Sequence, residues 1–326
     1  MKSRKTVKVS IIVGLCILLI FSLNQIFCLF FISQSFKPLK SIYAPDSKDF
    51  IKEHRPVYTG NDEVELFYQE EKDRCYPLLK SLSRQVSTKS FDGLNLNAYL
   101  ALHPQNHNYA ILMHGFRDSP KITSPYAMHF FENGFNVLVP GQRGHGWSEG
   151  NIIDMSAFTP NDVKSWIEFL CDFDSEAKIA LWGISMGAST VMQTLGFALP
   201  KNVVCCIEDC GFSSAWDEFS HQLTYFYHLP VHPLLDSANI YLKHHLKIDT
   251  KKVSAKAALT RAKIPTLFIH GSADEYVPFY MLDIVFDAAA CPKEKLVIEG
   301  AQHARSAFTA PKEYWEAVDT FLGKWF

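Results

Sequence analysis

The stretch Leu181–Ser189 reads Leu-Trp-Gly-Ile-Ser-Met-Gly-Ala-Ser, and the rest of the chain can be understood by working outward from it. An apolar run from Lys178 to Trp182 stops at a glycine, a lone serine follows, and a second glycine precedes a helix-like stretch. This order predicts a strand, a sharp turn with Ser185 at its tip, and a helix. Residues two before and two after the serine must have almost no side chain in so tight a turn, and Gly183 and Gly187 meet that need.

The predicted turn gives Ser185 the position of a nucleophile. Strain in such a turn lifts the hydroxyl clear of the sheet and places the amide of Met186 at the start of a helix, where it can bind an oxyanion. The alternative is a glycine-rich turn without a chemical role, as occurs in many α/β proteins. The apolar strand before Ser185 and the small residues after it favour the nucleophile.

Composition limits the class of protein and its partners. The 326 residues are 48% hydrophobic and 20% charged, which suits one large globular domain with additional segments. A net charge of -2 argues against a nucleic-acid partner.

The eight cysteines contain no C-x-x-C pair with a partner, so we expect no zinc site. Cys205 and Cys206 lie in an apolar run and are expected to be buried, while disulfides remain open for a domain on an oxidising side.

The N-terminus resembles a membrane anchor. Basic residues crowd the first eight positions, and a long apolar run follows from Val9 to about Ile32. About 20 residues of helix cross a bilayer. A cleaved signal peptide is the alternative, but its apolar region is shorter, and Ser33–Ser35 is a weak cleavage site. We therefore expect a cytoplasmic tail and transmembrane signal anchor over 1–32.

The anchor predicts a cell-membrane protein with a single span. The basic tail favours the cytoplasmic side, although Lys37, Lys40 and Lys48 follow the span and dilute this bias. The catalytic domain is then expected to be extracellular. The prolines and the glycine of 33–60 predict a stalk, and the remaining domain covers 61–326.

Beyond the stalk, apolar strands alternate with amphipathic helices. Such alternation predicts an α/β fold with a mostly parallel central sheet flanked by helices. The expected strands are 109–113, 136–139, 178–182, 203–207, 265–269 and 295–298, after a hairpin over 84–103. The expected helices are 63–80, 124–133, 162–173, 185–199, 280–289 and 312–326. The aromatic and histidine-rich segment 212–258 interrupts the alternation and is predicted to form a helical cap over the ligand crevice.

A serine nucleophile needs a base, and the base needs an acid that orients it. His303 follows the last predicted strand, so its loop delivers an imidazole to the edge of the sheet where Ser185 is expected. Asp274 follows another strand and a glycine turn, and completes the chain order serine, acid, histidine. Glu275 is a neighbour that could be mistaken for this acid. Asp209, after the preceding strand, is the more serious alternative.

Two backbone amides are expected to form the oxyanion hole. Met186 supplies one, and Phe116, in the loop after the 109–113 strand, supplies the other. The glycine-dense loop 140–150 lacks the Gly-Lys-Ser/Thr ending of a nucleotide-binding loop, so we expect no nucleotide and no other cofactor. Arg143 and His145 are instead expected to anchor that loop at the rim of the site.

Together these motifs resemble the α/β-hydrolase superfamily over about 60–326. Within it, the chain is similar to membrane-anchored or exported cell-surface hydrolases of Gram-positive bacteria, which are related to the serine aminopeptidase and monoglyceride-lipase-like groups. Family members often carry aspartate where Gln142 stands. The motifs behind the resemblance are His114–Phe116, Arg143–Gly146, the Ser185 turn, Glu208–Gly211, the Asp274 loop and His303.

The resemblance implies a Ser185–Asp274–His303 triad but does not define the substrate. We expect a serine hydrolase that cleaves carboxylic esters, in the manner of an esterase or lipase, through an acyl-enzyme on Ser185. The aromatic cap and the anchor suit an acyl or aromatic small-molecule substrate. A serine peptidase of the same fold, resembling an aminopeptidase, and a catalytically inactive membrane-bound binding protein are the alternatives.

Overall fold

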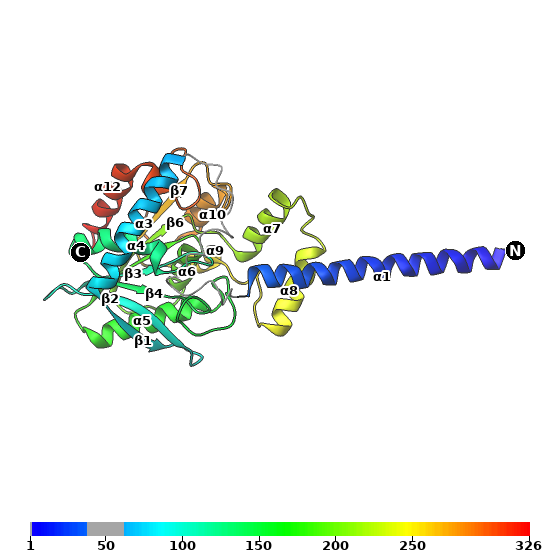
Figure 1. Ribbon diagram of the computed structural model, residues 1–326, viewed down its shortest axis with the longest axis horizontal. Helices are drawn as coiled ribbons and strands as arrows, with labels where there is room; N and C mark the ends of the chain where they lie inside the picture. The colour runs from blue at the N-terminus through cyan, green and yellow to red at the C-terminus, as the bar shows by residue number, and fades with distance from the viewer. Residues whose placement is uncertain (1, 38–61) are drawn as a thin grey trace.

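Eight strands assemble into one sheet in the computed structural model, which describes residues 2–37 and 62–326 (Figure 1). The strand order across the sheet is β1-β2-β4-β3-β5-β6-β7-β8. The strands are β1 (Ser83–Lys89), β2 (Asn95–Ala101), β3 (Asn108–Met113), β4 (Asn136–Pro140), β5 (Lys178–Ile184), β6 (Val203–Asp209), β7 (Thr266–Gly271) and β8 (Lys293–Ile298). Each expected strand and the expected hairpin is therefore confirmed, with small shifts at the ends.

The sheet is mostly parallel, as the alternation of strands and helices predicts. β1 pairs with β2, and β2 with β4, in antiparallel register. β3 pairs with β4 and β5 in parallel, and the parallel pairing continues through β6, β7 and β8. The parallel strands all end at the same edge of the sheet, which is where ligand sites of such sheets form.

Helices cover both faces of the sheet, and alternate residues of each strand face one layer or the other. On β3, Ala110 and Leu112 join the core beneath α3, α4, α11 and α12, whereas Ile111 and Met113 join the core beneath α5, α6, α9 and α10. The first layer is α3 (Asp62–Leu82), α4 (Pro120–Glu132), α11 (Ser306–Thr309) and α12 (Pro311–Leu322). The second layer is α5 (Thr159–Phe173), α6 (Met186–Thr194), α9 (Ala255–Leu259) and α10 (Tyr280–Ala288).

The cap expected over 212–258 is present as helices between β6 and β7. Its two longer helices, α7 (Ala215–Tyr225) and α8 (Leu234–His245), stand away from the sheet, and α1 (Lys2–Ser35) runs beside α8 (Figure 1). The hydroxyl of Ser214 accepts a hydrogen bond from the amide of Asp217 and caps the start of α7. Because the cap begins just after the carboxyl end of β6, it projects from the carboxyl edge of the sheet.

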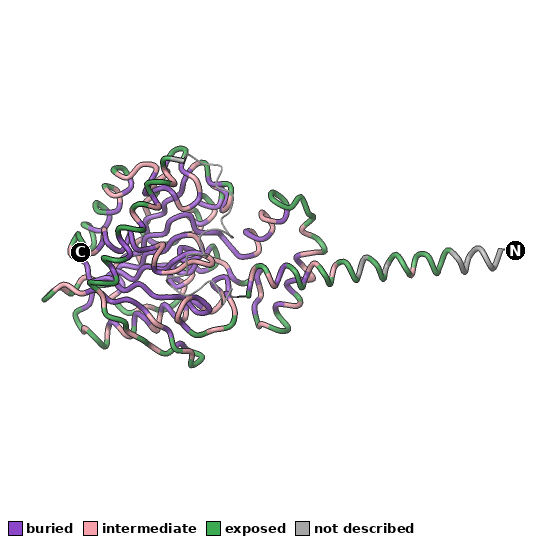
Figure 2. Tube along the Cα trace, in the orientation of Figure 1, coloured by how far each residue is buried: buried purple, intermediate pink, exposed green. Residues whose placement is uncertain are grey.

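Helix α1 leaves the globular part of the molecule, and most of its described residues before the cap are exposed (Figure 2). Val9, Leu18, Ile26 and Phe30, spaced along the helix, are 60%, 61%, 64% and 56% exposed. Among the residues that the structure describes, no helix has both the length and the apolar character needed to cross a membrane. The signal anchor expected over 1–32 is therefore not confirmed, and nearly all of the expected stalk lies outside the described residues.

The main difference from the expected elements lies after the Ser185 turn. The helix expected over 185–199 ends at Thr194, because Gly196 approaches α9 closely. A Cβ at Gly196 would lie 2.9 Å from the Cβ of Ala258. The last turn tightens there, and the amide of Gly196 donates to the carbonyl of Gln193. All eight cysteines are free, and Cys205 and Cys206 are buried as expected.

Candidate active site

The turn between β5 and α6 has the strained geometry that its sequence predicts. Ser185 has φ 57° and ψ -120°, a left-handed conformation that is rare for a residue with a side chain. The amide of Ser185 donates to the carbonyl of Asp209 at 2.8 Å, which ties the turn to the end of β6. Met186 begins α6, so its amide is one of the first in the helix and has no acceptor within it.

Both glycines of the turn are required by close backbone contacts. A Cβ at Gly183 would lie 2.3 Å from the carbonyl oxygen of Gly187. A Cβ at Gly187 would lie 2.1 Å from the carbonyl oxygen of Met113, at the end of β3. Real Cβ atoms do not approach other atoms so closely, so any side chain at either position forces the backbone to move.

His303 lies between Ser185 and Asp274. Its Nε2 is 2.9 Å from Oγ of Ser185, and its Nδ1 is 2.7 Å from Oδ2 of Asp274. When Nδ1 carries the proton and donates to Asp274, Nε2 is free to accept the hydroxyl proton of Ser185. The structure thus brings together the three residues predicted to form the triad, from the loops after β5, β7 and β8.

Asp274 is held as a carboxylate although it is buried. Burial alone raises the pKa of a carboxyl group, but the charge of His303 and hydrogen bonds from His270 and His303 outweigh it and lower the pKa of Asp274 to about 2. The amides of Tyr276 and Val277 also donate to Oδ1, at 2.9 and 3.0 Å. The acid is therefore charged and fixed in position throughout the neutral pH range.

His270 is a second histidine on the same carboxylate, and the sequence reasoning missed it. Its Nε2 lies 3.2 Å from Oδ2 of Asp274 and 2.9 Å from the carbonyl oxygen of Val277. Burial lowers the pKa of His270, but its hydrogen bond with Asp274 and the charge of that carboxylate outweigh this and raise the pKa. The sequence feature that could have identified His270 is its position at the end of β7, four residues before Asp274. This position places its side chain at the same carboxyl edge of the sheet as Asp274.

The two alternative acids do not contact His303. Asp209 ends β6 and is buried, and burial raises its pKa to about 6. Glu275 is exposed at the surface, and its carbonyl oxygen contacts Nε2 of His221 at 2.8 Å. Of the three carboxylates considered from the sequence, Asp274 alone bonds the imidazole of His303 among the described contacts.

The loop after β3 lies directly against Ser185. A Cβ at Gly115 would lie 3.4 Å from the Cβ of Ser185, so the backbone of this loop is next to the nucleophile. Phe116 is the next residue, which is the position expected for a backbone donor to the oxyanion. Nδ1 of His114 donates to the carbonyl of Gly115 at 2.9 Å, and the amide of Gln142 donates to Nε2 of His114 at 3.1 Å. Burial and nearby His145 keep the pKa of His114 well below its ordinary value, so the neutral ring can make both bonds.

Gln142 and Arg143 anchor the glycine-dense loop after β4. The side-chain amide of Gln142 donates to the carbonyl of His114, which joins this loop to the loop beside Ser185. Arg143 is buried and forms bidentate pairs with Asp162 at 2.6 Å and with Asp92 at 3.0 Å. The expected anchoring role of Arg143 is confirmed, and its partners come from α5 and from the β1–β2 turn.

One group of metal-ligand types occurs among the described residues, and it overlaps the site. Ligand atoms of Cys210, Asp274 and His303 lie within 4.8 Å of one another. Burial raises the pKa of the Cys210 thiol well above its ordinary value, which opposes the thiolate that binds metals. Both nitrogens of His303 already face Ser185 and Asp274, so the arrangement fits proton transfer better than metal binding.

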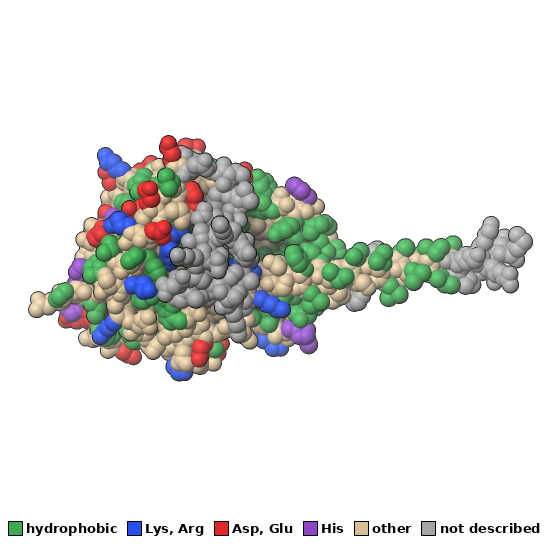
Figure 3. All heavy atoms as spheres, viewed as in Figure 1, with side chains coloured by type: hydrophobic (Ala, Val, Ile, Leu, Met, Phe, Trp, Pro, Cys, Tyr) green, Lys and Arg blue, Asp and Glu red, His purple; other side chains and the backbone are tan. Residues whose placement is uncertain are grey.

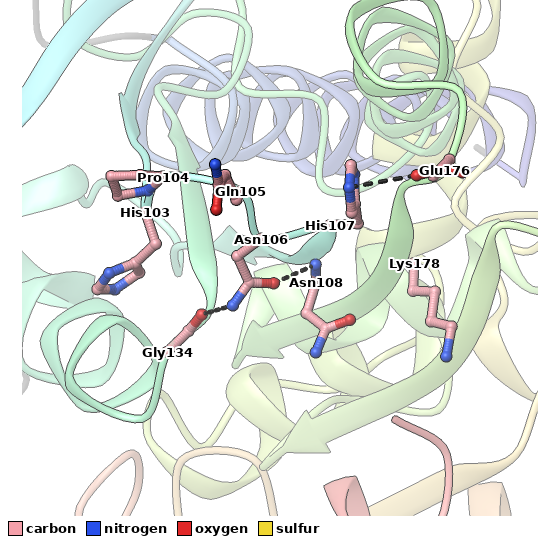
Figure 4. A pocket seen from close by; sticks show the side chains of 9 residues that line it. All are labelled: His103, Pro104, Gln105, Asn106, His107, Asn108, Gly134, Glu176 and Lys178. Atoms are coloured by element: carbon pink, nitrogen blue, oxygen red, sulfur yellow. Dashed lines mark hydrogen bonds and ion pairs between the residues drawn. The ribbon is translucent and has the colours of Figure 1, made fainter.

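A separate surface pocket lies at the other end of the sheet. His103, His107 and Glu176 are among its lining residues, near the start of β3 (Figure 4). The ring of His107 contacts Asp174 and Glu176 at 2.8 and 3.2 Å. None of the five predicted site residues lines this pocket. The catalytic candidates are therefore at the carboxyl ends of the strands, and this pocket is at the amino ends.

Comparisons with known proteins agree with this fold. Residues 104–207 match the family described as serine aminopeptidase, S33. The protein YqkD of Bacillus subtilis (strain 168) is 27% identical over 276 residues, which cover 84% of this chain and 86% of YqkD. The protein Rv2307c of Mycobacterium tuberculosis (strain H37Rv) is 23% identical over 242 residues, which cover 73% of this chain and 79% of Rv2307c.

Solved structures share the same architecture. The esterase Pf2001 of Pyrococcus furiosus superimposes with a TM-score of 0.62 at 21% identity, over 76% of this chain and 95% of Pf2001. The α/β-hydrolase GrgF of Penicillium superimposes with a TM-score of 0.60 at 18% identity, over 74% and 98% of the two chains. A puromycin-hydrolyzing peptidase of Mycobacterium tuberculosis superimposes with a TM-score of 0.56 at 17% identity, over 75% of this chain and 40% of the peptidase.

Proposed function

Because the chain has the α/β-hydrolase fold, we propose that it is a serine hydrolase that cleaves carboxylic esters through an acyl-enzyme on Ser185. The observation that carries this proposal is the position of His303, with Nε2 at 2.9 Å from Ser185 and Nδ1 at 2.7 Å from Asp274. A hydroxyl is a weak nucleophile at neutral pH, and this arrangement gives it both a base and a group that orients the base.

In the first half of the proposed reaction, Oγ of Ser185 attacks the ester carbonyl and Nε2 of His303 takes the hydroxyl proton. The negative charge on the carbonyl oxygen is bound by the amides of Met186 and Phe116, and each such donor contributes about 3 to 4 kcal/mol to binding of the transition state. His303 then gives the proton to the departing alcohol. Asp274, with its low pKa, stays ionised and stabilises the imidazolium.

Water completes the proposed cycle. His303 removes a proton from a water molecule, which attacks the acyl-enzyme, and then returns that proton to Ser185 as the acid leaves. The products are a carboxylic acid and an alcohol, and no cofactor enters either half of the reaction. The cap and the loops beside Ser185 share one cluster of buried apolar side chains, and this apolar setting supports an acyl substrate.

Peptide cleavage is the second candidate, and two comparisons favour it. The matched family is described as serine aminopeptidase, and one structural neighbour hydrolyses puromycin. An aminopeptidase needs a carboxylate to bind the substrate amine. Glu218 of α7 is buried, but burial raises its pKa to about 8 and Gln222 donates to it at 2.8 Å. A protonated and partnered carboxyl group is a poor site for an ammonium ion, so esters remain the first choice.

We also propose that α1 attaches the protein to the cell membrane, with the catalytic domain outside. The basic residues in the first turns of α1 and its exposed apolar side chains support this proposal (Figure 3). Treatment of intact cells with protease is the test. Digestion of the catalytic domain is expected, and full protection of that domain would overturn the orientation.

The test of the reaction is a panel of p-nitrophenyl esters set beside aminoacyl p-nitroanilides. We expect turnover of the esters, abolished in Ser185→Ala, with little turnover of the anilides. Faster cleavage of the anilides would favour the peptidase. Absence of turnover and of fluorophosphonate labelling in the folded protein would favour the catalytically inactive binding protein.

A further inference from the structure

The last turns of α1 are buried, in contrast to the helix before them. Phe30 is 56% exposed, whereas Phe36, in the turn that follows α1, is 1% exposed. Cys28, Phe31 and Ile32 are buried with it. The change occurs where α1 reaches the cap, so this end of the helix forms part of the core of the domain.

Ring contacts and hydrogen bonds both attach this end of α1. The ring centroids of Phe31 and Phe219 are 4.9 Å apart with their planes at 79°, and those of Phe36 and Phe219 are 5.7 Å apart. The edge-to-face arrangement of Phe31 and Phe219 places the positive edge of one ring against the negative face of the other, which is favourable. The amide of Ile153 donates to the carbonyl of Phe36 at 2.8 Å.

Polar contacts hold the neighbouring turns of α1. Asn24 donates from Nδ2 to Oγ of Ser237 on α8, at 2.8 Å. The guanidinium of Arg117, one residue after Phe116, donates to the carbonyl of Gln34. The helix is therefore linked both to the cap and to the loop that is proposed to carry one oxyanion donor.

The same apolar cluster reaches the proposed oxyanion hole. We define the α1–cap cluster as Phe31, Phe36, Met155, Met186 and Phe219, all of which are buried in one group. The side chain of Phe116 packs against the same group of buried residues. The two residues whose amides are the proposed donors, Met186 and Phe116, therefore lie within this group or against it.

We propose that the α1–cap cluster binds the acyl chain of the substrate and that Phe36 and Phe31 limit the length of chain accepted. This inference rests on the proposed function. It adds a binding site for an aliphatic acyl group to the reaction, and it makes the end of α1 a part of that site. Aromatic rings held by several contacts resist displacement, so removal of one ring opens space that methylene groups of a longer chain fill.

The test is the ratio of kcat/KM for p-nitrophenyl decanoate to that for p-nitrophenyl acetate, measured on the full chain. The alcohol is the same in both esters, so the ratio reports the acyl site. Each added methylene in an apolar pocket changes kcat/KM about tenfold or more. We expect Phe36→Ala to raise the ratio at least about tenfold and Phe36→Trp to lower it. Phe31→Ala is expected to act in the direction of Phe36→Ala.

Phe30→Ala is the matched control, because it removes the same ring from an exposed position one residue from Phe31. Its ratio should equal that of the wild type. Fluorophosphonate labelling shows that each variant is folded, and Phe36→Leu replaces Phe36→Ala in the same comparison if the alanine variant does not label. Equal ratios in wild type and in the labelled Phe36 variants overturn the acyl site while the proposed function stands. A wild type that labels but cleaves neither ester overturns the ester reaction and this site together.

Discussion

The carboxyl edge of the sheet and the α1–cap cluster are built in opposite ways. The catalytic candidates at the edge are polar side chains whose positions are set by hydrogen bonds, as where four donors converge on Asp274. The α1–cap cluster is apolar and depends on ring contacts such as that between Phe31 and Phe219. Under the proposed function the two regions have separate tasks: directional bonds position the reacting atoms, whereas firmly packed apolar rings select the acyl chain.

Removal of the nucleophile is the largest expected effect on the catalytic edge. Ser185→Ala is expected to lower kcat for p-nitrophenyl acetate by at least about 10⁴-fold, because no other group can form the acyl-enzyme. Steady-state kinetics measures the loss. Cys210→Ala, which removes a neighbouring buried side chain outside the proposed triad, is the control and should keep most of the activity. Activity retained by Ser185→Ala would contradict the assignment.

The next effect concerns the loop that supports the edge. Arg143 bonds both Asp162 and Asp92, and the side chains of these two aspartates are 3% and 42% exposed. Asp162→Asn removes the buried one of the two charges that neutralise Arg143, so it is expected to cost about 3 to 5 kcal/mol of unfolding free energy. Asp92→Asn is expected to cost about 1 kcal/mol or less, because its carboxylate is exposed. Urea unfolding at pH 7.5 compares them, and equal costs would contradict the role of burial.

Fold and candidate triad were both predictable from the sequence, because each depends on local signals. Gly183 and Gly187 are required by contacts within the turn, and His303 and Asp274 follow strands that end at one edge. The acid was the harder choice, since Asp209 and Asp274 end neighbouring strands, and only the direction of the His303 ring separates them.

What the sequence did not reveal depends on contacts between distant segments. His270 precedes the Asp274 loop as one of thirteen histidines, and only the folded chain places it against Asp274. Phe31 belongs to the apolar run that predicts a membrane anchor, and Phe36 belongs to the expected stalk. Nothing in either segment marks these rings as partners of Phe219. Helix α6 is likewise shortened by its approach to α9, a contact that propensity does not encode.

A smaller effect concerns the buried carboxyl group behind His270. Burial raises the pKa of Glu208 to about 8, so the folded state holds its proton more tightly than the unfolded state, whose pKa is near 4.5. Its contribution to stability is complete below the unfolded pKa and is lost as pH rises towards 8. Glu208→Gln keeps an oxygen for the amide of Gly211, which donates at 3.0 Å.

We therefore expect Glu208→Gln to be more stable than the wild type at pH 9 by at least about 1.4 kcal/mol, the equivalent of one pKa unit. The difference should shrink at pH 5. Urea unfolding at the two pH values measures it, and comparison with the wild type cancels the contributions of other buried carboxyl groups. A difference that does not depend on pH would show that Glu208 is ionised in the folded protein.

The smallest expected effect is in the attachment of α1. Ser237→Ala removes the acceptor of Asn24, and one such bond contributes about 0.5 to 1.5 kcal/mol. Thermal unfolding is expected to shift slightly, with the rate of fluorophosphonate labelling unchanged. Thr224→Ala is the matched control, because that hydroxyl bonds only carbonyls of its own helix, α7. A large fall in the labelling rate of Ser237→Ala would mean that the catalytic edge of the sheet depends on the attachment of α1 to the cap.

The most direct measurement is the location of a covalent adduct. The wild type, His303→Ala and Phe36→Ala are treated with a fluorophosphonate, and the labelled peptides are mapped by mass spectrometry. We expect one adduct, on Ser185, in the wild type and in Phe36→Ala, and a loss of labelling by at least about 100-fold in His303→Ala, because the base is missing. An adduct on another residue, or labelling of His303→Ala at the rate of the wild type, would contradict the proposal that the edge of the sheet is catalytic and that the α1–cap cluster binds the acyl chain.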